Sequence, residues 1–155
     1  MTVIATASPH NHAFCTSLGA HSVHDYRSPS IIPDLISAVQ STNGTFAGLY
    51  DAISTSSDSY PSTVPVVEGL GGGVLAVVLT QPENPPASVQ AARVFGISEK
   101  TEGLWREFIT PALEEGVVKC VPEAWVVGKG LESVQKGLEE NKKGVSARKV
   151  VVELE

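Results

Sequence analysis

Apolar and polar residues are arranged along this chain in short blocks that predict strands and helices in alternation. Segments of strand character occupy residues 3–5, 22–25, 46–53, 74–79, 91–97, 117–121 and 149–154. Between them, apolar residues recur at helical spacing over 9–18, 33–40, 64–70, 102–115 and 130–140. This alternation predicts an α/β domain built on a doubly wound parallel sheet.

Two segments are expected to supply much of the core. Residues 74–79 (VLAVVL) form a continuous apolar run, typical of a parallel strand covered on both faces, and we expect them at the centre of the sheet. The helix over 102–115 carries Leu104, Trp105, Phe108 and Leu113 on one face, which predicts that these side chains point inward.

Charge and cysteine content narrow the class of protein. The 155 residues have a formal net charge of -6, and the only dense basic group lies at 142–149, which argues against nucleic acid as a partner. No run approaches the ~20 apolar residues of a membrane span, and the start lacks a signal-peptide pattern. Cys15 and Cys120 lie in dissimilar contexts, which favours reduced thiols. We therefore expect a cytoplasmic protein that binds neither membranes nor nucleic acid and acts on a small molecule.

Candidate binding residues follow the predicted strands. In an open parallel sheet, ligands bind beyond the carboxyl ends of the strands, and Ser8, Tyr26, Ser54 and Thr80 lie at or just past such ends. Residues 1–18 contain no Asp or Glu, so the first strand–helix junction has no carboxylate for the ribose hydroxyls of an unphosphorylated cofactor.

The same junction carries groups suited to a phosphate. Ser8 has a hydroxyl, Asn11 has an amide, and His10 and His12 have imidazoles, while Tyr26 has a flat ring for adenine. These residue types predict NADPH, because its 2′-phosphate needs donors and no negative charge nearby.

Structural roles compete with these assignments. Ser8 could equally cap the following helix with Pro9 in its first turn, and Tyr26 could pack at a strand end. A metal site is not expected, because His10 and His12 lie two positions apart and face different sides of a helix. The glycines at 69–74 precede a strand instead of following one, which predicts a turn and not a dinucleotide fingerprint.

Longer segments resemble a known family. The resemblance is carried by VIATASPHNHAFCTSLGAHSVHDYRSP, YDAIS, GGGVLAVVL and GLESVQKGLEENKKGVSARKVVVEL, in this order and spacing. Together they are similar to the carboxyl half of a medium-chain dehydrogenase/reductase. The closest likeness is to fungal zinc-binding-type oxidoreductases and to the trans-acting enoyl reductases that assist polyketide synthases, and it covers essentially the whole chain.

The resemblance implies positions for a cofactor and a substrate. The Ser8 to Asn11 segment and Tyr26 would surround the adenosine 2′-phosphate of NADPH. The backbone of Val78 and Leu79 would pass near the nicotinamide. Phe95 and Gly96 would border the substrate.

By the same resemblance, the catalytic domain, the first Rossmann strand and its glycine-rich turn are expected upstream of Met1. The fold is then an incomplete Rossmann-type doubly wound parallel sheet. A partial NADP-binding domain would span 1–128, and a carboxyl-terminal helix and strand over 129–155 would return to the missing domain. We expect a split sheet, since the absent strand lies between the second and fourth in the order 3-2-1-4-5-6. No catalytic or zinc-binding residue is expected.

Two functions from different classes follow. The first is a truncated NADPH-dependent oxidoreductase, enoyl or carbonyl reductase-like, with little activity alone because the pyrophosphate contacts are lost. The second is a non-catalytic interaction module that forms a homo- or heterodimer through an exposed sheet edge at 95–97.

Overall fold

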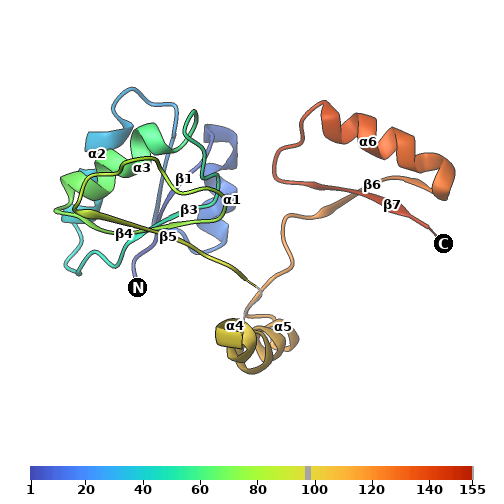
Figure 1. The fold of residues 1–155 in the computed structure, drawn as a ribbon. Helices are drawn as coiled ribbons and strands as arrows, with labels where there is room; N and C mark the ends of the chain where they lie inside the picture. The colour runs from blue at the N-terminus through green and yellow to red at the C-terminus, as the bar shows by residue number, and fades with distance from the viewer. Residues whose placement is uncertain (97–98, 155) are drawn as a thin grey trace. The chain divides into compact units, whose positions relative to one another are not determined.

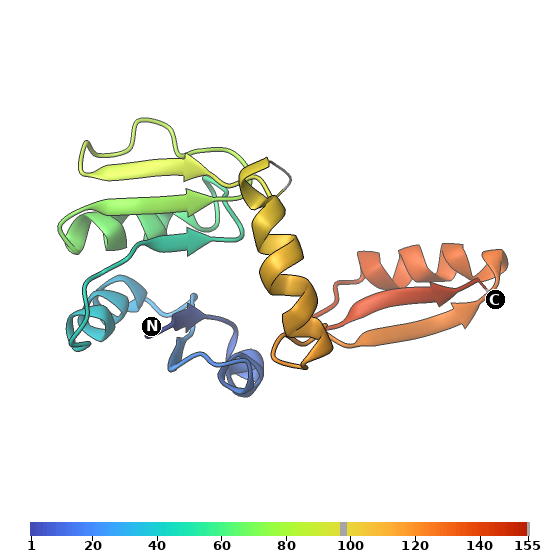
Figure 2. The ribbon, with the colours of Figure 1, turned by 90° about the horizontal axis from the view of Figure 1, so that it is seen from below.

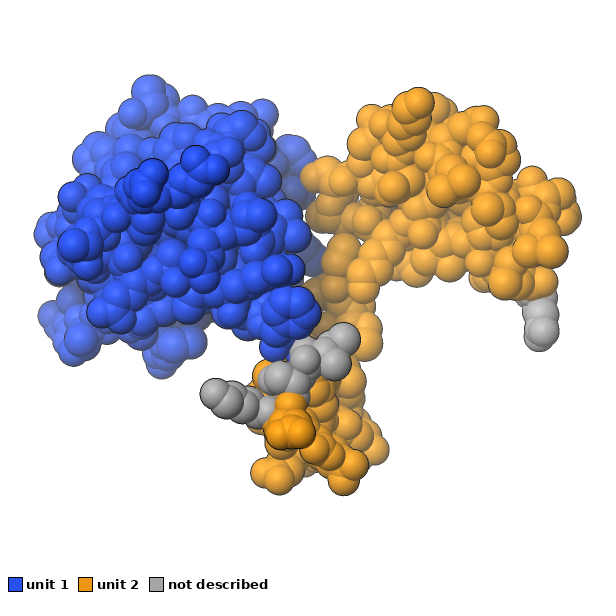
Figure 3. Space-filling view, in the orientation of Figure 1, with its two compact units in different colours: residues 1–96 blue, residues 97–155 orange. Residues whose placement is uncertain are grey.

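The chain folds into two compact units, residues 1–96 and 97–155 (Figure 3). The structure, a computed structural model, describes residues 1–96 and 99–154, without the side chain of Lys100. Both units combine helices with parallel strands (Figure 1), which confirms the predicted α/β class. The domain boundary predicted after residue 128 stays a prediction.

Unit 1 alternates strands and helices in the predicted order. Pro33 lies in the first turn of the second helix, where a missing N–H costs nothing, and the apolar Ile31 and Leu35 fall on its buried face. The elements are β1 (Ile4–Thr6), η1 (Pro9–Asn11), α1 (His12–Ser17), β2 (Ser22–His24), α2 (Ile31–Gln40), β3 (Leu49–Asp51), α3 (Tyr60–Gly69), β4 (Gly73–Val77) and β5 (Val89–Arg93).

The sheet of unit 1 is split in two. β1 pairs in parallel with β2, and β4 pairs in parallel with both β3 and β5. Among the described residues, no strand joins β1 to β3, so the strand orders are β1-β2 and β3-β4-β5. The predicted interruption is confirmed, and it falls between the strands expected to flank it.

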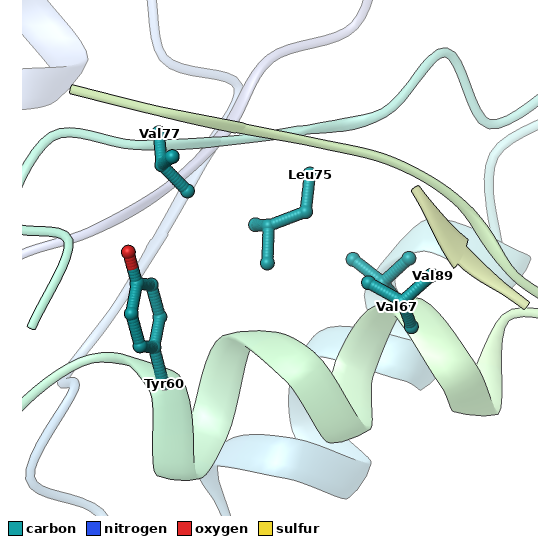
Figure 4. Packing of buried hydrophobic residues seen from close by; sticks show 5 residues of the cluster. All are labelled: Tyr60, Val67, Leu75, Val77 and Val89. Atoms are coloured by element: carbon teal, nitrogen blue, oxygen red, sulfur yellow. The ribbon is translucent and has the colours of Figure 1, made fainter. Parts of the chain in front are cut away.

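One helical layer packs under both parts of this sheet. Ile31 and Leu35 of α2 form a buried cluster with Val66 of α3, and Ile4 of β1 and Leu49 of β3 both pack against it. A second cluster fills the space between α3 and the three-stranded sheet (Figure 4). Its buried members are Tyr60, Val67, Leu75, Val77 and Val89.

The expectation that 74–79 is covered on both faces is wrong, although β4 is the central strand of its sheet. Leu75 and Val77 are fully buried, whereas Val74 on the opposite face is 42% exposed. The helix α3 covers only one face of this strand, so burial alternates along it as in a half-buried strand.

The turn before β4 supports a stability prediction. A Cβ added at Gly72 (φ +96°) would lie 2.5 Å from the Ser88 carbonyl oxygen, whereas one at Gly71 (φ +92°) would meet nothing within 4 Å. We expect Gly72→Ala to lower the free energy of unfolding by about 2 kcal/mol more than Gly71→Ala, because both share the left-handed strain and only Gly72→Ala adds the clash. Parallel urea titrations measure this difference, and equal losses would contradict it.

Unit 2 contains one continuous helix with a π-helical middle segment and a two-stranded parallel sheet. The helix runs through α4 (Glu99–Gly103), the π-helical η2 (Leu104–Ile109) and α5 (Thr110–Glu114). β6 (Ala124–Lys129) pairs with β7 (Lys149–Glu153), and the two are connected through η3 (Leu131–Ser133) and α6 (Val134–Lys142). Val127 of β6 is buried, and Gly137 of α6 lies against Val152 of β7.

Two expectations for unit 2 are wrong. Residues 117–121 form a bend followed by irregular chain and not a strand. Val117 is exposed, and the strand is made by β6 instead. The apolar face of the 102–115 helix is not directed inward, since its four large side chains are between 40% and 54% exposed. The described residues do not bury these side chains. The four side chains are Leu104, Trp105, Phe108 and Leu113.

Candidate functional site

The strands of unit 1 end at a common edge. β3, β4 and β5 are parallel, and β1 is parallel to β2. The arrows of β1, β3, β4 and β5 point the same way (Figure 2). The structure therefore places the segments after β1, β2, β3 and β4 along the edge where ligands of open parallel sheets bind.

Ser8 and Tyr26 leave neighbouring strands at the same level. Thr6 of β1 pairs with His24 of β2, and the Ala7 amide donates to the His24 carbonyl at 3.0 Å. Each of the two residues lies two positions beyond this pair, which is the last of the β1–β2 ladder. They therefore follow the ends of two neighbouring strands, although they are 18 positions apart in sequence.

The Ser8 side chain does not cap the following helix. Ser8 precedes η1 in an extended conformation, with Pro9 in the first turn, as a cap would require. Its hydroxyl nevertheless makes no capping hydrogen bond. The capping alternative therefore lacks the interaction that defines it. His10 and Asn11 lie in η1 itself, directly after Ser8.

Tyr26 presents its ring to solvent beside an arginine that sequence reasoning missed. The Tyr26 side chain is 51% exposed, so it does not simply pack at the strand end. The Arg27 guanidinium carbon lies 5.2 Å from the centre of the Tyr26 ring. The signal for Arg27 was its place directly after the tyrosine in the Asp-Tyr-Arg stretch.

The ends of β3 and β4 are joined through Ser54. Its hydroxyl donates to the Asp51 carbonyl at 2.6 Å and accepts the Val78 amide at 2.8 Å. Ser54 is fully buried and has φ +56°, an unfavourable left-handed conformation for a residue with a Cβ. This side chain therefore fixes the backbone at Val78, one of the two positions predicted to pass near a nicotinamide; the other, Leu79, is half exposed.

Asp51 holds the same turn, and sequence reasoning did not single it out. Its Oδ1 accepts the amides of Ile53 and Ser54 at 2.9 and 2.8 Å, and its Oδ2 accepts the Thr63 hydroxyl at 3.2 Å. Asp51 is 4% exposed, and these three donors satisfy its carboxylate. An acid at a strand end followed by serine three positions later was the available signal.

The loop after Ser54 is organised by hydroxyl groups. Hydrogen bonds from Ser57 and Thr55 lower the pKa of the exposed Asp58. The Tyr60 hydroxyl donates to the Thr80 carbonyl, which ties the start of α3 to the segment after β4. The loop is thereby connected to the same edge of the sheet.

Phe95 and Gly96 follow the end of β5. Phe95 is 59% exposed, and the Arg93 guanidinium carbon lies 4.7 Å from the centre of its ring. Their role beside a substrate stays a prediction, as does pairing through the 95–97 edge, because Ile97 lies outside the described residues.

Two histidines contact backbone groups at the two ends of β1. His12 Nε2 lies 3.0 Å from the Ala7 carbonyl oxygen, and His21 Nδ1 accepts the Val3 amide at 3.1 Å.

Within 1–96 and 99–154, no three His, Cys, Asp or Glu side chains are gathered so that they could hold a metal ion. No described helix has the length and apolar character needed to cross a membrane.

Curated proteins match the chain over nearly its full length. No protein-family model matches it. It is 41% identical to the dehydrogenase orsE of Emericella nidulans over 98% of the chain and 43% of that protein. It is 36% identical to the trans-enoyl reductase himH of Aspergillus japonicus over 99% of the chain and 45% of that protein. The chain therefore spans about half the length of the curated relatives it matches.

Solved structures show the same fold at lower identity. The CurK enoyl reductase superposes with a TM-score of 0.67 at 15% identity, covering 97% of this chain and 46% of that one. CurA from Vibrio vulnificus, solved in complex with NADPH, superposes with a TM-score of 0.64 at 16% identity, covering 99% and 49%. At these identities the likeness establishes the architecture, an incomplete form of a larger α/β fold.

Proposed function

We propose that this chain, which belongs to the medium-chain dehydrogenase/reductase family, carries the adenosine-binding part of an NADPH-dependent oxidoreductase. It corresponds to a carboxyl-terminal half of the type found in fungal dehydrogenases and trans-enoyl reductases. One observation supports this most directly. Ser8, whose hydroxyl makes no capping bond, and Tyr26, whose ring is half exposed, each follow the last residue pair of the β1–β2 ladder by two positions. A hydroxyl and a flat ring are the groups that a 2′-phosphate and an adenine require.

The second part of the proposed site lies at the ends of β3 and β4. When bound, NADPH supplies a hydride, which such an enzyme transfers to a carbonyl or to an activated alkene. The backbone of Val78 and Leu79 would border the nicotinamide end. Ser54 holds the Val78 amide, and Asp51 holds Ser54, so this border is kept rigid by buried hydrogen bonds.

The proposal includes low activity for these 155 residues alone. They contain no G-x-G-x-x-G turn, the element whose backbone amides bind the pyrophosphate of a dinucleotide. We therefore expect weak binding of intact NADPH and little turnover. A cytoplasmic, reducing location belongs to the same proposal, supported by the free thiols Cys15 and Cys120.

The adenosine end can be tested without the rest of the cofactor. We expect the chain to bind 2′,5′-ADP more tightly than 5′-AMP, which lacks only the 2′-phosphate. Ser8→Ala and Tyr26→Ala should each weaken 2′,5′-ADP binding about tenfold, the equivalent of one good polar or stacking contact. Amide chemical shifts during titration measure both affinities and locate the ligand.

A surface tyrosine provides the matched control. Tyr50 is 63% exposed and belongs to β3, which pairs with neither β1 nor β2, so Tyr50→Ala should bind 2′,5′-ADP like the unmodified chain. Equal affinities for 2′,5′-ADP and 5′-AMP, or shifts confined to residues outside the β1 and β2 ends, would contradict the proposed function.

A further inference from the structure

Arg27 is the only lysine or arginine among the first 92 residues. The same stretch contains six acidic residues, so it carries a negative net charge, which disfavours phosphate binding elsewhere on it. The single permanent cation follows directly after Tyr26, beside the proposed adenosine site. The six acids are Asp25, Asp34, Asp51, Asp58, Glu68 and Glu83.

The turn after β2 fixes where this cation lies. Asp25 Oδ1 accepts the Arg27 amide at 3.0 Å, and the Asp25 carbonyl accepts the Ser28 amide at 3.0 Å. The Arg27 Nε atom lies 3.5 Å from the same Asp25 oxygen, and the guanidinium lies over the Tyr26 ring. Two contacts therefore hold the guanidinium beside the ring.

The terminal nitrogens of Arg27 remain available to a ligand. The side chain is 60% exposed, and Asp25 contacts it through Nε. Among the described residues, no carboxylate pairs with the terminal amino groups. A guanidinium held in this way can give two parallel N–H bonds to one phosphate, which a lysine cannot do.

We infer that Arg27 is the specificity-determining residue that binds the 2′-phosphate and so distinguishes NADPH from NADH. The inference rests on the proposed function and deepens it. Ser8, Asn11 and Tyr26 supply neutral contacts to the same nucleoside, and Arg27 supplies the charge that the phosphate needs. Asp25 shapes the turn that carries Arg27, and its Oδ1 lies 3.5 Å from the Arg27 Nε.

The test compares 2′,5′-ADP with 5′-AMP on the whole 155-residue chain by NMR titration. We expect Arg27→Ala to weaken 2′,5′-ADP binding between tenfold and a hundredfold and to change 5′-AMP binding less than twofold. Arg27→Lys should restore part of the loss, since it returns the charge without the paired donors. The affinity of the unmodified chain for 2′,5′-ADP should also fall more steeply with salt than that of Arg27→Ala.

Arg93 is the matched control, because its guanidinium also lies over an aromatic ring, that of Phe95. Arg93→Ala should bind both nucleotides as the unmodified chain does. If Arg27→Ala keeps the preference for 2′,5′-ADP, the inference is overturned while the proposed function stands. If the unmodified chain shows no such preference, both are overturned. Unchanged circular dichroism of Arg27→Ala confirms that any loss of binding is not a loss of fold.

Discussion

We expect Leu75→Ala to lower the free energy of unfolding of unit 1 by about 4 kcal/mol. Leu75 is fully buried at the centre of β4, the middle strand of the three-stranded sheet, and packs in the cluster with Tyr60 and Val67. Removing a buried leucine side chain loses its transfer free energy and leaves a cavity that close-packed neighbours fill only in part, and such changes cost about 2–5 kcal/mol. One parallel strand on each side of β4 leaves little freedom to collapse, which favours the upper part of that range.

Two kinds of aromatic residue allow this loss to be assigned to unit 1. The three tyrosines, Tyr26, Tyr50 and Tyr60, all lie in residues 1–96, and both tryptophans lie in 97–155. Urea unfolding followed by the near-ultraviolet circular dichroism of tyrosine should shift to lower urea in Leu75→Ala. Leu18→Ala, at a side chain that is 48% exposed, should change the free energy by less than about 1 kcal/mol. Similar losses in both variants would contradict the core that the structure shows.

Asp51→Ala is expected to cost about as much, through a different mechanism. The substitution leaves the amides of Ile53 and Ser54 and the hydroxyl of Thr63 without their acceptor in a buried place. Unsatisfied buried donors cost about 1–3 kcal/mol each, so we expect a loss of about 4 kcal/mol, somewhat less than the sum because solvent reaches part of the turn. The Val78 amide should also lose protection from hydrogen exchange, since Asp51 holds the Ser54 that accepts it.

Two further variants test whether the loss of stability comes from the buried hydrogen bonds of Asp51. Asp51→Asn keeps one side-chain acceptor, so it should recover part of the lost stability. Asp34→Ala, in the exposed first turn of α2, should cost less than about 1 kcal/mol. Asp51→Ala with unchanged stability and unchanged exchange at Val78 would show that the buried hydrogen bonds of this turn do not stabilise unit 1.

The sequence predicted the features that depend on the order of elements. Alternating strands and helices, β4 as a central strand and the interruption between β1 and β3 all follow from which strand must pair with which. The same rule predicted that Ser8 and Tyr26 follow strand ends at one edge of the sheet, and both residues do follow the ends of the paired strands β1 and β2.

The features that failed depend on what covers a surface. The run at 74–79 is apolar enough for burial on both faces, yet burial also requires a layer on each side, and among the described residues only α3 covers this strand. A short apolar run such as 117–121 has the composition of a strand, but only the pairing of β6 with β7 decides where the strand forms.

Asp51 and Arg27 were missed for a related reason. An acid or a base in a short polar segment is normally a solvated surface group, and its sequence neighbours do not reveal what it contacts. Asp51 is buried because Thr63, twelve positions later, lies over it on α3. Arg27 matters because residues 1–92 contain no other Lys or Arg, which is visible in the sequence only when the cations are counted by region.

The shared helical layer under the split sheet sets a mechanical property of unit 1. No ladder hydrogen bond among the described residues crosses from β1 to β3, so the spacing of the two parts of the sheet depends on the methyl groups of Ile4 and Leu49 against α2 and α3. Such contacts are non-directional and permit small sliding movements, whereas a ladder would not. The ends of β1 and β2 can therefore shift relative to the ends of β3 and β4 without breaking a backbone hydrogen bond. A nucleotide bound across both parts of the proposed site would have to fix their spacing itself.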